Sequence, residues 1–129
     1  MENILVPVSP AELLDKITIL EIKSERMSDP DKLANVRREL ALLADTWVRS
    51  AREDETVLAL RTQLKGVNES LWEIEDDIRD KERNGEFDER FIQLARNVYF
   101  TNDRRSFIKQ ELNRHLGSQI VEEKSYLAY

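Results

Sequence analysis

The sequence contains no cysteine, only three glycines and three prolines, and no long apolar run. Without cysteine the chain has no disulfides, no thiol catalysis and no zinc–thiolate or iron–sulfur centre. Charged residues recur every few positions, so no segment approaches the roughly 20 apolar residues of a membrane-spanning helix. The N-terminus also lacks the basic and apolar regions of a secretion signal. We therefore expect a cytoplasmic protein that does not associate with membranes.

The chain is instead rich in charges of both signs, which make up 36% of its 129 residues and leave a formal net charge of -6. Interspersed charges suit the exposed faces of helices. A net negative charge disfavours binding to a phosphate backbone, so no nucleic-acid partner is expected. With 40% apolar residues, the chain is long enough for one shared core, and we predict a single domain over residues 1–129.

Two helices are predicted in the first half of the chain, at about residues 10–27 and 30–49. Ser9, Pro10 and Glu12 form a capping box with proline at the first helical position. Pro30 ends one helix and begins the next. The second helix then has apolar residues at alternating spacings of three and four, namely Leu33, Val36, Leu40, Leu43 and Trp47. The short connection predicts a helical hairpin.

Two longer helices are predicted in the second half, at about residues 54–84 and 88–116. The first has the most regular heptad of the chain: Val57, Leu60, Leu64, Val67, Leu71, Ile74 and Ile78. Gly85 ends it, and Asp88 caps the next helix. That last helix continues an apolar stripe in which two positions, Thr101 and Arg105, are polar. Such a short turn predicts that these two helices pack as neighbours.

The predicted fold class is all-α. We expect a four-helix antiparallel bundle of two hairpins, the second long and coiled-coil-like, with short extended termini. Residues 4–6 are apolar and suited to a short strand, and residues 120–129 to an extended tail.

A first candidate site lies at the polar interruption of the second hairpin. A buried guanidinium requires a partner, so Arg105 is expected to meet a small anionic ligand, a carboxylate or a cluster of backbone carbonyls. The first alternative is an anion site between the helices; its residues are Arg105, Asn102, Thr101, Asn68 and Lys16. In the second, Glu21 or Glu25 pairs with Arg105 and sets the register of the bundle.

A second candidate site is the acidic run Glu73, Asp76, Asp77 and Asp80. Helical spacing places several of these carboxylates on one face, as a magnesium site requires. Glu12 and Asp15 would supply a second pair, as in an all-helical nucleotide pyrophosphohydrolase. Neighbouring arginines and lysines favour a solvated face instead, so no metal and no cofactor is expected.

Four stretches resemble a bacterial family of small proteins catalogued only as a domain of unknown function. They are ILVPVSPAELLDKITILEIK, LWEIEDDIRDKER, TNDRRSFIKQELN and VEEKSYLAY, which together span nearly the whole chain. The resemblance implies a cytosolic protein and supplies no catalytic residues.

The function predicted from these features is binding to a second copy of the chain or to a partner protein. Five aromatic residues exceed what one four-helix core covers, which favours a homodimer: Trp47, Trp72, Tyr99, Phe100 and Phe107. The alternative is a small enzyme or ligand-binding protein. It would use either the anion site, in the manner of a helical mutase that stabilises a carboxylated transition state, or the magnesium site.

Overall fold

The structure is a computed structural model that describes all 129 residues. It contains four helices and no strands: α1 (Pro10–Arg26), α2 (Pro30–Ser50), α3 (Glu55–Asn84) and α4 (Glu89–His115). Each predicted helix is confirmed to within one residue at both ends. The helix contacts are consistent with a bundle, so the predicted all-α class is confirmed. None of the helices combines the length and apolar character needed to cross a membrane.

The helix boundaries have the local causes that the sequence indicated. The Ser9 hydroxyl accepts a hydrogen bond of 3.1 Å from the backbone N–H of Glu12, at the start of α1. Asp54 and Asp88 cap α3 and α4 in the same way. Gly85 ends α3 at φ 65°, in the left-handed region where a side chain is disfavoured.

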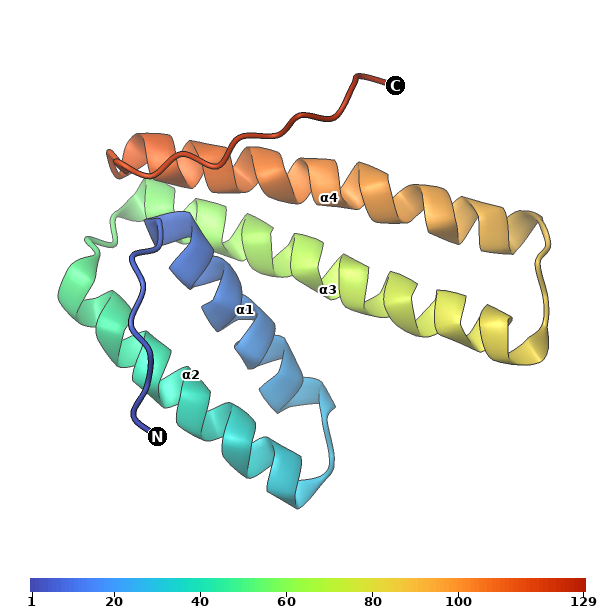
Figure 1. Cartoon of the computed structure of the whole chain (residues 1–129), viewed down its shortest axis with the longest axis horizontal. Coiled ribbons are helices and arrows are strands. Elements are labelled where there is room, and N and C mark those ends of the chain that lie inside the picture. The colour runs from blue at the N-terminus through green and yellow to red at the C-terminus, as the bar shows by residue number, and fades with distance from the viewer.

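Helix α1 is the central element of the molecule. It packs against α2, α3 and α4, whereas α2 makes close backbone contacts with α1 alone. Figure 1 shows α1 and α2 as a pair set at an angle to α3 and α4, which run side by side. An amphipathic helix with one apolar stripe covers one neighbour, but α1 is buried on several faces. Its contacts therefore join the two helical pairs.

The core lies where the N-terminal part of α1 meets the start of α3 and the end of α4. Leu14, Val57, Leu64 and Leu112 have no exposed surface there. Trp47 of α2 belongs to the same cluster and is only 3% exposed. Trp47 was expected among the aromatic residues that one core could not cover, and for this residue the expectation is wrong, because α2 brings the ring into the core.

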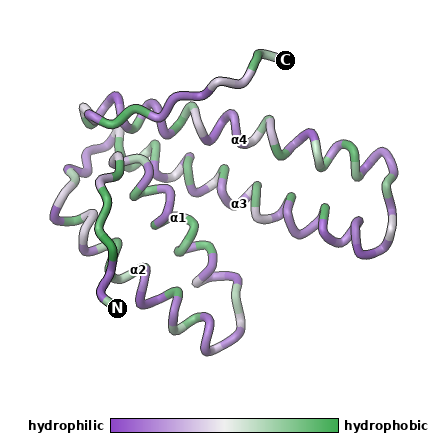
Figure 2. Tube along the Cα trace, in the orientation of Figure 1, coloured by the Kyte–Doolittle hydropathy of each residue, from purple (hydrophilic) through white to green (hydrophobic).

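The part of the α3–α4 pair nearest the connecting turn extends beyond α1 and α2 (Figure 1). We call residues 69–107 the outer hairpin. Of these 39 residues only Leu94 is buried. Apolar and polar residues nevertheless continue to alternate along both helices as far as the turn (Figure 2). The outer hairpin therefore has apolar stripes but too few neighbours to bury them.

Both termini are extended. The short strand expected at residues 4–6 is absent, and those residues are exposed without regular structure. A strand needs a second strand to satisfy its backbone groups, and the chain offers none. Residues 120–129 form an extended tail, as predicted, and the tail runs back along α4 (Figure 1).

Candidate functional site

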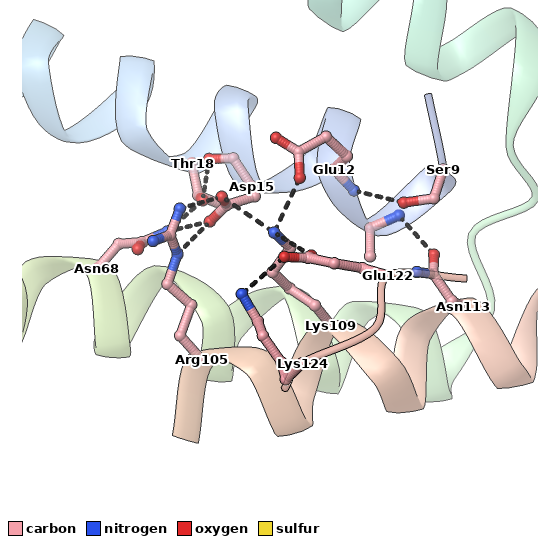
Figure 3. Close-up of polar contacts among 11 residues, drawn as sticks. Ser9, Glu12, Asp15, Thr18, Asn68, Arg105, Lys109, Asn113, Glu122 and Lys124 are labelled. Carbon is pink, nitrogen blue, oxygen red and sulfur yellow. Dashed lines mark hydrogen bonds and ion pairs between the residues drawn. The ribbon is translucent and has the colours of Figure 1, made fainter. Parts of the chain in front are cut away.

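The most distinctive polar group of the interior is the carboxylate of Asp15 on α1. Its side chain is 2% exposed, although an unpaired carboxylate is among the most costly groups to bury. Asp15 lies one and a half turns into α1, on the face directed toward α3 and α4 (Figure 3). The capped start of α1 thus places a negative charge between two other helices.

Arg105 of α4 neutralises the charge of Asp15 in a bidentate ion pair. Its Nε donates a hydrogen bond of 3.0 Å to Oδ1 of Asp15, and its Nη2 donates to Oδ2. Both oxygens of the carboxylate are therefore engaged by one planar guanidinium, the strongest common geometry for such a pair. The hydrogen bond to Asp15 raises the pKa of Arg105, although burial opposes the shift. The two residues are 90 positions apart in the chain and join α1 to α4.

Asn68 of α3 adds the third helix to this group. Its Nδ2 donates to Oδ1 of Asp15 at 2.9 Å and to the Thr18 hydroxyl at 3.1 Å. Thr18 in turn donates to the backbone carbonyl of Asp15 at 2.9 Å. Asp15, Thr18 and Asn68 are all buried, and each has a hydrogen-bond partner within the group. A shift of any one helix along its axis would leave a buried polar group without its partner.

Lys109, one turn after Arg105 on α4, extends the group toward the surface. Its Nζ lies 2.8 Å from Glu12, 3.4 Å from Glu122 of the tail and 3.7 Å from Asp15. Burial alone would lower the pKa of the Lys109 amine. The hydrogen bond to Glu12 and the charges of all three carboxylates outweigh burial, and the pKa of Lys109 is raised. Lys109 is therefore a charged lysine held among carboxylates.

We call Glu12, Asp15, Thr18, Asn68, Arg105 and Lys109 the ionic centre (Figure 3). Its two carboxylates balance its two cations, and every charge has a partner of opposite sign. The partner of Arg105 is Asp15, where Glu21 or Glu25 was expected. Those two glutamates lie further along α1 and pair with α3, Glu21 with Arg61 at 3.6 Å and Glu25 with Lys65 at 2.5 Å.

The residues predicted to form an anion site are only partly brought together. Asn68 and Arg105 meet at Asp15. Thr101 is half-buried and makes no side-chain hydrogen bond, and Asn102 is exposed. Lys16 is exposed and forms no ion pair, because it follows Asp15 by one residue and so projects from another side of α1. The mutase-like alternative needs Arg105 for a ligand, but this guanidinium already holds a carboxylate of the chain.

The acidic run on α3 is arranged as paired surface charges. Glu73 lies 3.3 Å from Arg26, Asp77 lies 3.9 Å from Arg90, and Asp80 pairs with Arg83. Asp76 lines a small hollow between α1 and α3. No three carboxylates or histidines of the chain converge as a set of metal ligands. Glu12 and Asp15, proposed as a second carboxylate pair for magnesium, are both occupied by Lys109.

Sequence reasoning missed Lys109, Glu122 and Lys124, and it considered Asp15 only as a metal ligand. One feature of the sequence could have indicated that Asp15 is buried. Helix α1 has apolar residues all around its axis, which indicates burial on more than one face. Asp15 lies on the same helical face as Ala11 and Ile19, four residues before and after it, so its carboxylate is expected to be buried and to need a cationic partner from another helix.

The fold and the ionic centre together define the class of this protein: an all-helical protein whose two helical pairs are joined at a buried ion pair. A model of a family described as a family of unknown function (DUF6165) matches residues 4–129. The chain therefore belongs to this family, which confirms the resemblance noted from the sequence. No curated protein and no solved structure matches the chain.

Proposed function

We propose that the protein is a self-associating module and that two copies pair through their outer hairpins. The observation that carries this proposal is that residues 69–107 keep the apolar periodicity of core helices while only Leu94 is buried. The ionic centre holds the base of the outer hairpin at Arg105, whereas the part nearer the turn extends beyond α1 and α2. The tail covers a portion of the hairpin, where the Tyr129 ring lies against Tyr99.

The apolar surface of the outer hairpin is substantial. Phe87 is 61% exposed, Ile92 49% and Tyr99 44%. Several more apolar side chains of the two helices are only half-buried: Leu71, Trp72, Ile74, Ile78, Phe91, Val98 and Phe100. Two helices alone cannot enclose side chains of this size, whereas two hairpins packed together form a four-helix assembly with an enclosed core.

The charges of the outer hairpin favour one arrangement of the two copies. Residues 69–84 of α3 carry seven carboxylates and three basic side chains, whereas residues 87–107 carry three carboxylates and four arginines. Packing α3 against α3 of a second copy would bring two acidic stretches together, which is unfavourable. Packing α3 against the partner's α4 avoids this repulsion and satisfies a two-fold axis.

The total surface is large enough for such an interface. The chain exposes 9233 Å², whereas a compact monomer of 15.2 kDa exposes about 7,100 Å². The difference of roughly 2,100 Å² comes from the extended termini and the outer hairpin. A stable dimer of ordinary size buries about 800 Å² on each partner. A dimer interface on the outer hairpin would therefore bury less than half of this extra exposed surface.

The experiment compares two substitutions at equally exposed apolar residues. Ile92→Glu places a charge on the outer hairpin, where Ile92 is 49% exposed. Leu42→Glu places the same charge on α2, where Leu42 is 50% exposed. We expect sedimentation velocity to show weaker self-association for Ile92→Glu by about tenfold or more, and no change for Leu42→Glu. Equal effects of the two variants would contradict an interface on the outer hairpin.

A further inference from the structure

The tail after α4 is attached to the body almost entirely by side chains. Residues 119–129 form no backbone–backbone hydrogen bond, and the last such bond runs from the N–H of Ser118 to the carbonyl of Asn113. At the far end of the tail the Tyr129 ring lies 5.4 Å from the ring of Tyr99, and its hydroxyl donates to Asp103. This hydrogen bond raises the pKa of Tyr129 to about 12. A segment held in this way can leave the body without breaking any regular structure.

A groove of about 990 Å³ lies between the tail and α4. Asn102, Arg105 and Lys109 line it from the helix, and Glu122, Lys124 and Tyr126 from the tail. Its volume falls in the range of sites for small ligands, and it combines aromatic walls with a few convergent polar groups.

Within the groove the carboxylate of Glu122 lies between two ammonium groups. Its Oε1 is 2.7 Å from Nζ of Lys124 and its Oε2 is 3.4 Å from Nζ of Lys109. Both lysines appear with Glu122 in Figure 3. Lys124 and then Lys109 lower the pKa of Glu122, so its carboxyl group is ionised. This position is therefore shaped for an anion.

Lys109 and Glu122 differ in how deeply their side chains are buried and in how many partners hold them. The side chain of Lys109 is 12% exposed and is held by Glu12 and Asp15 of the body. That of Glu122 is 49% exposed and belongs to the loosely attached tail. The cation is thus a permanent part of the molecule, whereas the anion opposite it is replaceable.

We propose that this groove binds a small anionic ligand, a phosphate or a carboxylate, whose charged group replaces the carboxylate of Glu122 on Lys109 and Lys124. The side chain of Glu122 is then a built-in competitor that occupies the site until the ligand displaces it, while Lys124 and Tyr126 of the tail stay in the groove. The ligand's apolar part lies along Tyr126 and the neighbouring wall of the groove. Arg105 keeps its contact with Asp15 and only borders the site.

The test is isothermal titration calorimetry of the full chain with inorganic phosphate and, separately, with malonate, at constant ionic strength. Glu122→Gln removes the competing charge, and Glu123→Gln is the matched control because Glu123 forms no ion pair. We expect saturable binding that Glu122→Gln tightens about fivefold, because a larger fraction of molecules has a vacant site. We expect no change for Glu123→Gln, and weaker binding for Lys124→Met.

The two probes distinguish the ligand classes. Saturation by phosphate alone assigns a phosphate-bearing ligand, and saturation by malonate alone assigns a carboxylate. Equal affinities of wild type, Glu122→Gln and Glu123→Gln would overturn the proposal. So would the absence of saturation by either probe in Glu122→Gln, since that variant has the competitor removed.

Discussion

Asp15 and Arg105 join the two helical pairs, and their removal should be costly. Arg105→Ala leaves the Asp15 carboxylate, 2% exposed, without its main partner. We expect the free energy of unfolding to fall by about 3 kcal/mol, the lower end for a broken buried pair, because Asn68 and Lys109 still contact Asp15. Urea denaturation followed by circular dichroism measures this change.

Arg104→Ala provides the control on the same helix. Arg104 is exposed and forms no ion pair, so its loss should change stability by less than about 0.5 kcal/mol. If Arg105→Ala were as mild as Arg104→Ala, the ion pair would have no structural role.

Glu53 makes a second link, between α2 and α3, and it predicts a pH dependence. Its carboxylate accepts hydrogen bonds from the Trp47 indole at 2.9 Å and from Arg61 at 2.8 Å. The pKa of Glu53 is lowered from its ordinary value of 4.5, chiefly by the hydrogen bond from Trp47 and secondly by the hydrogen bond and charge of Arg61. The ionised carboxylate of Glu53 therefore stabilises the folded state at pH values above 4.5. This stabilisation is lost as the pH falls through the lowered pKa that Glu53 has in the folded state.

We expect Glu53→Gln to cost about 1 kcal/mol near neutral pH. The difference from wild type should shrink as the pH falls below about 4.5. Tryptophan fluorescence during urea unfolding measures both quantities, because Trp47 is the partner of Glu53. Glu39→Gln, at an exposed glutamate without an ion pair, should show neither effect. A difference for Glu53→Gln that does not vary with pH would contradict this account.

The sequence predicted that Arg105 needs a partner but assigned the wrong one. Heptad spacing locates a residue on its own helix, whereas a partner depends on how far one helix is shifted along another. Asp15, Glu21 and Glu25 all lie on α1, and only the packing of α1 against α4 selects Asp15. Asn68 was expected to lie opposite Arg105 because a short turn connects α3 and α4, and both side chains contact Asp15.

At the scale of single elements, we predict opposite effects on stability when alanine replaces the glycine inside α3 and the glycine that ends it. Gly85 has φ 65°, so Gly85→Ala should lower stability by about 1 kcal/mol. Gly66 lies in the interior of α3, and a Cβ there meets nothing within 4 Å. Gly66→Ala should therefore raise stability by about 0.5 to 1 kcal/mol. Thermal unfolding of both variants checks the signs, and a destabilised Gly66→Ala would mean that this surface of α3 is covered.

We predict that the acidic run of α3 does not bind divalent metals and that these metals do not stabilise the protein. Glu73, Asp77 and Asp80 are paired with arginines, and no three carboxylates converge as metal ligands. Magnesium or manganese should therefore leave the melting temperature unchanged at constant ionic strength. A saturable rise that disappears in the double variant Asp76→Asn and Asp77→Asn would contradict this prediction.

Helix boundaries followed from the sequence because their causes are local. Ser9, Asp54, Asp88 and Gly85 each act within one turn of the helix that they begin or end. The strand predicted at residues 4–6 failed because a strand depends on a distant partner. Local chemistry thus accounts for the elements, while contacts between distant segments decide which of them pair.

At the scale of the whole molecule, the central position of α1 was not predicted. Apolar stripes indicated four helices that share one core, but α2 makes close backbone contacts with α1 alone and the outer hairpin extends beyond both. The length of α3 decides this shape: its 30 residues exceed the 17 of α1, so α1 covers only part of it. The uncovered remainder is the surface that we propose for self-association.

The molecular mass in solution tests this proposal most directly. Size-exclusion chromatography with multi-angle light scattering, over a range of protein concentrations, should give twice the chain mass of 15.2 kDa. On dilution the mass should fall toward that of one chain, as expected for a reversible dimer. A mass of 15.2 kDa at every concentration would contradict self-association through the outer hairpin.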